Sequence, residues 1–259
     1  KVIEVKAIPI SEPELEIGAV ALIEDQTATS RIDRVRRDFI ANLTHELRTP
    51  IAAIGLLAET LRGEEEQVVL DSLTQKIVNE TDRVDQIIDD LLELSRVELD
   101  GSPRREPVDV RLLLSSVEDQ HRFKANSKNI QIEKTDTEAG LKLMGDTGQL
   151  NRALSNLVDN SIKYSDENSI IHLEAVRGKT HIDLVVKDQG IGIPKADLDR
   201  IFERFYRVDK ARSRATGGTG LGLSIVRHVA ANHGGEILLQ SREGEGSKFT
   251  IRLPEDLEE

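Results

Sequence analysis

The chain has 259 residues, of which 38% are hydrophobic and 32% charged, and its formal net charge is -12. This length predicts about two compact domains, or one domain with an elongated element. The acidic surface repels phosphates, so we expect no nucleic-acid partner. The absence of cysteine excludes disulfides, thiolate catalysis and Cys-ligated zinc.

No apolar run approaches the roughly 18–20 residues that span a bilayer, and no signal peptide is visible. The chain begins at Lys1 rather than at a methionine. We therefore interpret it as a cytoplasmic fragment of a longer protein. A membrane anchor of the intact protein would lie in segments absent from this fragment.

Residues 1–27 contain two segments that are typical of strands. Residues 2–7 alternate between apolar and polar side chains, and residues 18–23 form a second apolar run. Two strands alone are only marginally stable. We therefore predict that residues 1–27 are the C-terminal remnant of a larger domain, and they resemble the last hairpin of a PAS sensor domain.

Residues 28–104 carry apolar side chains at helical spacings of three, four and seven. The first run is Ile40, Leu43, Leu47, Ile54, Leu57 and Leu61, and the second, after a break at Gly63, is Leu70, Leu73, Ile77, Val84, Ile87, Leu91 and Leu94. This pattern predicts an antiparallel helical hairpin. A lone hairpin leaves half of each apolar seam exposed, so we predict a homodimer through residues 28–104 that forms a four-helix bundle.

Residues 105–259 alternate between strand and helix patterns. The predicted strands are 108–110, 130–133, 141–144, 169–176, 181–187, 236–240 and 248–253, and the predicted helices are 111–126, 147–164, 194–204 and 221–233. This mixture predicts an α/β two-layer sandwich. The predicted fold class is therefore α+β, with a dimeric helical hairpin followed by the two-layer sandwich.

His45 is the first candidate for chemistry. It lies two residues from both Leu43 and Leu47, so on a helix it points away from the apolar seam. Thr49 lies on the same face one turn later, and the adjacent Glu46 can accept a hydrogen bond from the imidazole. An exposed helical histidine is usually only a solvated residue, and we keep that interpretation for the other five: His121, His172, His181, His228 and His233.

Three further segments in residues 105–259 suit a nucleotide. Asn156 and Asn160 lie four apart on one helix face and Lys163 three residues further, which offers oxygens to Mg²⁺ and an ammonium to phosphate. Asp188, at the end of a strand, can accept a hydrogen bond from the exocyclic amine of adenine. The alternative interpretations are a solvated helix face and an ordinary turn.

The third segment, residues 217–226, is rich in glycine and leads directly into a helix. Free amides at a helix start bind phosphate. The Gly-Lys-Ser/Thr of a Walker loop is missing. Residues 202–214 precede this loop and contain Phe202, Phe205 and Tyr206, which predicts a lid over the nucleotide. The alternative is an ordinary helix and loop with aromatic residues in the core, Phe202 in particular.

Residues 39–50, Phe-Ile-Ala-Asn-Leu-Thr-His-Glu-Leu-Arg-Thr-Pro, resemble the phospho-acceptor box of sensor histidine kinases. The order of asparagine helix, Asp-x-Gly-x-Gly, Phe-rich segment and Gly-rich loop is similar to their catalytic domain. That domain is similar in turn to the ATPase domains of gyrase, the mismatch-repair ATPases and certain chaperones. The resemblance covers about residues 31–254 and implies ATP and Mg²⁺ as ligands.

The resemblance implies a role for each matching residue. His45 is the phosphorylated residue, Glu46 the acid/base and Thr49 a phosphatase-assisting residue. The implied ligands of magnesium and phosphate are Asn156 and Asn160, and the other implied nucleotide contacts are Lys163, Tyr164, Asp188, Gly190, Gly192, Arg207, Gly218, Thr219, Gly220, Leu221 and Gly222.

The implied activity is that of an autophosphorylating protein histidine kinase, which transfers the phosphoryl group from His45 to an aspartate of a response regulator. Phosphatase activity toward that regulator is also implied. An ATP-driven dimeric clamp is the alternative, and it explains the nucleotide segments but not the box around His45. A signalling scaffold with an inactive pocket is a third hypothesis, which the complete set of nucleotide residues disfavours.

Overall fold

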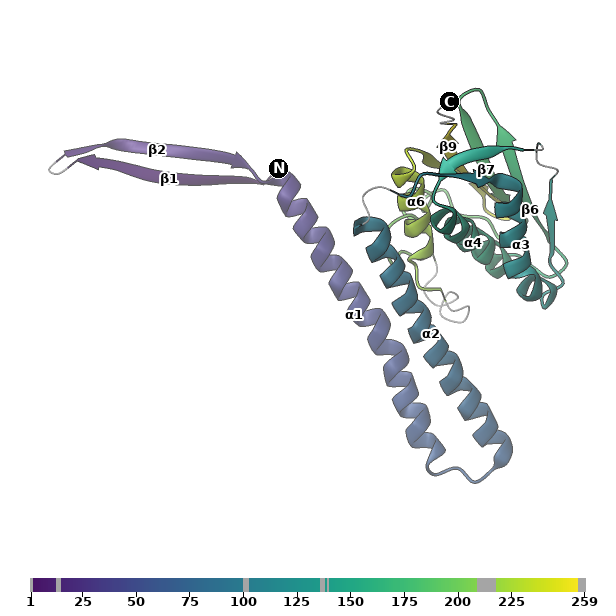
Figure 1. The fold of residues 1–259 in the computed structure, drawn as a ribbon. Coiled ribbons are helices and arrows are strands. Elements are labelled where there is room, and N and C mark those ends of the chain that lie inside the picture. The colour runs from purple at the N-terminus through teal and green to yellow at the C-terminus, as the bar shows by residue number, and fades with distance from the viewer. Residues whose placement is uncertain are drawn as a thin grey trace.

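The computed structural model describes residues 2–12, 15–99, 103–135, 138, 140–208 and 218–255. Gly217 and the last part of the predicted lid, residues 209–214, lie outside the described residues. Figure 1 shows a β-hairpin, a long helical hairpin and an α/β domain following one another along the chain.

The β-hairpin consists of β1 (Ile3–Glu12) and β2 (Leu15–Asp25), which pair antiparallel. It extends away from the rest of the chain (Figure 1). Its exposed large apolar side chains are Val2, Ile3, Val5, Ile8, Val20, Leu22 and Ile23. The hairpin ends directly at the first long helix, where the amide of Thr27 donates to Oδ1 of Asp25 at 2.9 Å.

The helical hairpin consists of α1 (Thr27–Leu61) and α2 (Gln67–Leu99). The two predicted helices are thus confirmed, and they lie side by side in opposite directions (Figure 1). Three seam residues of α2, Leu73, Ile87 and Leu94, are buried. Other apolar side chains of the hairpin remain exposed: Ile40, Ile51, Leu56, Val68, Val78, Ile88 and Leu92.

The α/β domain contains a five-stranded sheet in the order β4-β6-β7-β9-β8. Among the described strands, only β4 and β6 pair in parallel, and β3 and β5 form a separate antiparallel pair. The strands are β3 (Glu106–Asp109), β4 (Gln131–Lys134), β5 (Lys142–Gly145), β6 (Ile170–Arg177), β7 (His181–Lys187), β8 (Glu236–Arg242) and β9 (Gly246–Pro254).

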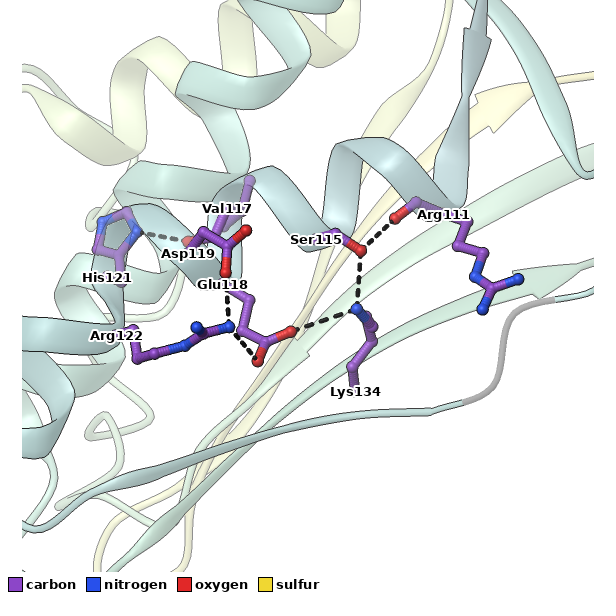
Figure 2. Close-up of polar contacts among 8 residues, drawn as sticks. All are labelled: Arg111, Ser115, Val117, Glu118, Asp119, His121, Arg122 and Lys134. Atoms are coloured by element: carbon purple, nitrogen blue, oxygen red, sulfur yellow. Dashed lines mark hydrogen bonds and ion pairs between the residues drawn. The ribbon is translucent and has the colours of Figure 1, made fainter.

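Three helices form the second layer of this domain: α3 (Val110–Asn126), α4 (Thr147–Tyr164) and α6 (Gly222–Asn232). Asp109 and Asp146 cap the first two, because each side chain accepts a hydrogen bond from an amide in the first turn. In Figure 2, Nζ of Lys134 on β4 donates to Ser115 at 2.7 Å and to Glu118 at 3.2 Å on α3. These bonds hold α3 beside the edge strand of the sheet.

The hydrophobic core of the domain lies between the helices and the sheet. Alternate residues of β7, Ile182, Leu184 and Val186, are completely buried, as are Leu154 and Leu157 of α4. The two-layer α/β fold predicted from the sequence is therefore confirmed. Among the described residues, no helix has the length and apolarity needed to cross a bilayer.

The prediction of a helix over residues 194–204 was wrong, because this segment forms a series of turns. The amides of Asp197, Arg200 and Glu203 each bond to a carbonyl three residues back. Only Ile201 makes the bond to the fourth residue back that defines an α-helix. Isolated turns of this kind do not propagate into a helix.

Candidate active site

A cavity of about 310 Å³ lies where α4, the segment after β7, the Gly-rich loop before α6 and α2 meet. This is within the size range of small-molecule sites, about 300–1,000 Å³. Predicted nucleotide residues that line it are Asn156, Asn160, Lys163, Tyr164, Asp188, Gly192, Arg207, Gly218, Thr219, Gly220 and Gly222. Two other predicted residues, Gly190 and Leu221, do not line the cavity. The amide of Gly190 donates to Asp188, and Leu221 is fully buried.

Asp188 is held rigidly at the end of β7. Its Oδ1 accepts hydrogen bonds from the amides of Gly190 at 2.9 Å and Ser247 at 3.1 Å, and its Oδ2 accepts one from Oγ of Ser161 at 3.2 Å. Burial raises the pKa of Asp188, and these three bonds oppose the increase. The carboxylate is therefore oriented before any ligand arrives, as a hydrogen-bond acceptor in a cavity wall.

Glycine is required at two positions beside Asp188. A Cβ at Gly190 would lie 2.6 Å from the carbonyl oxygen of Tyr164. Gly192 has a φ of +66°, and a Cβ there would overlap the carbonyl of Arg242. Only glycine combines this left-handed backbone with so close an approach. The sequence pattern Asp-x-Gly-x-Gly therefore shapes the cavity wall through steric necessity.

Asn156 and Lys163 of α4 line the cavity together with the Gly-rich loop, and their nitrogen donors suit phosphate. Nδ2 of Asn156 is buried without a hydrogen-bond partner, which is costly unless a ligand supplies an acceptor. A Cβ at Gly218 would overlap Nζ of Lys163, and one at Gly222 would lie 3.2 Å from Oδ1 of Asn156. Because these glycines lack side chains, the loop leaves room for Nζ of Lys163 and Oδ1 of Asn156.

Burial lowers the pKa of Lys163 to about 8, and Asp159 opposes this decrease. A bound polyphosphate would favour the charged lysine and raise its pKa again. Nucleotide affinity is therefore expected to be constant well below pH 8. As the pH rises through about 8, affinity should fall by up to about tenfold per pH unit, because binding must then take up a proton.

Calorimetric titration with an ATP analogue, in buffers of different ionisation enthalpy, measures both the affinity and the proton uptake. In the Lys163→Met variant, the fall in affinity above pH 8 should disappear. An identical pH profile in the two proteins would contradict the assignment of this proton to Lys163.

Residues 39–50 around His45 lie on α1, close to Phe205 and Arg207 of the α/β domain. His45 is exposed, as predicted, and Oγ1 of Thr49 donates to its carbonyl oxygen at 3.1 Å. Oε2 of Glu46 lies 3.3 Å from Nη2 of Arg207, which lines the cavity, and 3.7 Å from Nη2 of Arg83 on α2. The ion pair between Glu46 and Arg207 therefore joins α1 to the wall of the cavity.

The predicted lid contributes further contacts between the two domains. The rings of Phe39 on α1 and Phe205 have centroids 5.6 Å apart. Phe205 has a φ of +63°, and its amide donates to the carbonyl of Gly220 in the Gly-rich loop. The proposed contact of Arg207 with a γ-phosphate stays a prediction, since this side chain pairs here with Glu46.

Two cavity residues of the helical hairpin, Gln86 and Asp90, were missed by the sequence analysis. Asp90 lies three residues after Ile87 and four before Leu94, both of which are buried seam residues. A carboxylate at a position where the spacing calls for an apolar residue was the signal that could have revealed it. Ser161 and Ser247, which orient Asp188, carry no such signal.

Most of the remaining histidines have local partners. Nδ1 of His121 lies 2.9 Å from the carbonyl of Val117 one helical turn earlier (Figure 2), and His233 is bonded to Val229 and Asp146. His172 and His181 lie near carboxylates on the sheet. The expectation of a solvated side chain is wrong for His233, of which only 4% is exposed. The other four histidines are partly exposed.

The α/β domain thus carries a cavity of the size of a small-molecule site, and it is joined to a helical hairpin with an exposed histidine. Two family models match the corresponding segments. Residues 35–100 match the His Kinase A (phospho-acceptor) domain, and residues 145–257 match the histidine kinase-, DNA gyrase B- and HSP90-like ATPase.

Known proteins show the same combination. The sensor-like histidine kinase SenX3 of Mycolicibacterium smegmatis is 44% identical, over 92% of this chain and 62% of the relative. The mycobacterial sensor histidine kinase MprB is 31% identical with a TM-score of 0.51, over 58% of this chain and 97% of the solved chain. Full-length ShkA, solved with AMPPNP, is 26% identical with a TM-score of 0.59, over 84% of this chain and 45% of the solved chain.

The chain belongs to the sensor histidine kinases. It spans about three fifths of the length of the SenX3 relatives that it matches.

Proposed function

We propose that this chain is a protein-histidine kinase that transfers the γ-phosphoryl group of ATP to His45. The observation that carries the proposal is the junction of the two domains. Asp188, Lys163 and the glycines form a nucleotide cavity, and Arg207 in its wall pairs with Glu46, the neighbour of the exposed His45. The nucleotide analogue in the ShkA structure supports ATP as the ligand.

In the proposed reaction, the unprotonated ring nitrogen of His45 attacks the γ-phosphorus. The bond from this phosphorus to the bridging oxygen breaks, ADP leaves, and Glu46 accepts the proton from the other ring nitrogen. Among the described residues, Arg207 and Arg83 pair with Oε2 of Glu46, which leaves Oε1 for this proton. The protein otherwise acts by positioning and by neutralising charge, which carry most of phosphoryl transfer.

Mg²⁺ is expected to accompany ATP and to neutralise charge on the triphosphate. The amides of Asn156 and Asn160 line the phosphate end of the cavity and would provide the protein oxygens nearest to it. The unpartnered Nδ2 of Asn156 would at the same time donate to a phosphate oxygen.

We also infer that the phosphoryl group passes from His45 to an aspartate of a response regulator, and that two copies of the chain form a four-helix bundle. The exposed position of His45 supports access by a partner. The apolar side chains left exposed on α1 and α2 support dimerisation, because a second hairpin would bury them.

Sedimentation at micromolar concentration should show a dimer, and a monomer would contradict this assembly.

The proposed domains are 1–27, 28–104 and 105–259, and the two family matches fall within the second and third. The exposed apolar side chains of β1 and β2 support our proposal that residues 1–27 complete a PAS-like sensor domain. A longer chain should therefore bury these side chains. A cytoplasmic location of the 259-residue chain stays a prediction.

Incubation with γ-labelled ATP and magnesium tests the proposal directly. We expect label on the protein that is stable to alkali and lost in acid, as phosphohistidine is. ATP hydrolysis without labelled protein would favour the dimeric clamp. Nucleotide binding with neither hydrolysis nor label would favour the scaffold.

The Thr49→Ala variant is expected to keep autophosphorylation and to lose most of its phosphatase activity toward the partner. The hydroxyl of Thr49 donates to the carbonyl oxygen of His45 at 3.1 Å, and its oxygen could orient a water toward a phosphoryl group. The measurement is the decay of the phosphorylated regulator with added kinase and nucleotide. Unchanged decay would remove the proposed role of Thr49. Thr44→Ala, five residues earlier on α1, is the matched control, because its hydroxyl also donates to a carbonyl of α1.

A further inference from the structure

Asp90 is a buried carboxylate of the helical hairpin. Among the described residues, its side chain accepts hydrogen bonds from the α/β domain. Only 3% of its surface is exposed. Its Oδ2 accepts a hydrogen bond of 2.6 Å from Oγ1 of Thr219 in the Gly-rich loop, and its Oδ1 accepts one of 3.2 Å from Nη2 of Arg152 on α4. Burial raises the pKa of Asp90, and Thr219 and Arg152 oppose this increase. Asp90 thus ties α2 to the loop and to the α4 helix.

The hydrogen bond from Thr219 to Asp90 uses the only proton that the Thr219 hydroxyl can donate. Besides donating to Asp90, Oγ1 of Thr219 accepts a hydrogen bond of 3.2 Å from the amide of Leu221. Asp90 and Thr219 both line the nucleotide cavity. While Thr219 donates to Asp90, it has no proton left for a phosphate oxygen.

The negative charge of Asp90 also opposes the binding of a triphosphate. A carboxylate in the cavity wall repels the several negative charges of a triphosphate, and this repulsion is strong where water is excluded. The phosphates and Asp90 therefore compete for the same loop, both through the Thr219 proton and through electrostatics.

We propose that Asp90 is a positioning residue that latches the Gly-rich loop and α4 onto α2, and that bound triphosphate releases this latch. The inference rests on the proposed function, because it takes ATP as the ligand of the cavity. Binding of ATP and docking of the catalytic domain on the hairpin then oppose each other. Because such coupling is reciprocal, weakening the latch must strengthen nucleotide binding.

This expectation separates a latch from a merely structural contact. Loss of a structural contact would lower stability and leave nucleotide affinity unchanged or weaker. Loss of the latch tightens nucleotide binding even though a favourable contact has been removed.

The first test compares Asp90→Asn with Asp89→Asn. The Asp90 variant keeps the size of the side chain and an acceptor for Thr219, but it loses the charge. The Asp89 variant makes the same charge change one residue away, at an exposed position outside the cavity lining. Calorimetry with a magnesium-bound, non-hydrolysable ATP analogue should show binding about fivefold or more tighter for Asp90→Asn and within about twofold of wild type for Asp89→Asn.

Unchanged or weaker binding by Asp90→Asn would overturn the latch. If wild type binds no ATP analogue at all, the proposed function fails instead, so the two failures are distinguishable. Thermal unfolding monitored by circular dichroism shows whether the variant is folded.

A second measurement keeps the latch testable if Asp90→Asn does not fold. Glu93 of α2 lines a polar groove of about 700 Å³ between α2 and the α/β domain, together with Arg96, Gln120, His121, Gln149 and Arg152. Because the chain has no cysteine, Glu93→Cys introduces a single thiol into this groove. The ATP analogue should speed the reaction of this thiol with a maleimide at least about twofold, since released docking opens the groove. An equal or slower rate with the analogue would overturn the latch.

Discussion

The Asp188→Asn variant is expected to bind ATP about 10- to 150-fold more weakly than the wild type while remaining folded. A hydrogen bond to a charged group contributes about 1.5–3 kcal/mol, which corresponds to this range. Asparagine has the same shape as aspartate, and one oxygen can still accept from the amides of Gly190 and Ser247. The variant therefore removes a charged acceptor from the cavity wall and leaves the local backbone in place.

Asp183→Asn is the matched control for this experiment. Asp183 lies on the same strand, β7, but its two oxygens accept hydrogen bonds of 2.9 Å from Arg252 on β9, and it does not line the cavity. Its substitution should leave ATP affinity within about twofold of the wild type, because it alters partly buried ion pairs of the sheet that lie outside the cavity lining. Equal ATP affinity in the two variants, measured by calorimetry, would contradict the role assigned to Asp188.

The His45→Gln variant is expected to lose all acid-labile label while binding ATP within about twofold of the wild type. Glutamine has no nucleophilic nitrogen, so the phosphoryl group has no acceptor. ATP affinity should persist because His45 is exposed and does not line the cavity.

His121→Gln provides the control for the loss of a histidine. His121 also lies on a helix, where its ring is bonded to the backbone of its own helix at 2.9 Å (Figure 2). This variant should be labelled like the wild type in the same assay. Persistent label in His45→Gln would mean that another residue accepts the phosphoryl group.

The features that could be predicted from sequence are those that local spacing determines. The seams of α1 and α2 follow from apolar residues every three or four positions, and β7 matches its predicted bounds at 181–187. The cavity residues that the sequence did predict lie in short motifs whose geometry is local. Asn156 and Asn160 share a helix face, and Gly192 has the positive φ that its motif requires.

The features that were missed depend on how distant segments meet. The pairing of Glu46 with Arg207 joins residues from two domains, and the bond from Thr219 to Asp90 joins residues 129 positions apart. No local pattern encodes such a meeting. Residues 194–204 contain apolar and charged side chains compatible with a helix, but their bonds to carbonyls three residues back produce turns.

The central claim is that the cavity of the α/β domain supplies a phosphoryl group to the imidazole on α1. Tandem mass spectrometry of the wild-type chain, after incubation with ATP and magnesium and digestion at neutral to alkaline pH, tests it most directly. The account predicts one phosphorylated residue, His45. A phosphoryl group found on a serine, a threonine or a different histidine, with His45 unmodified, would contradict it.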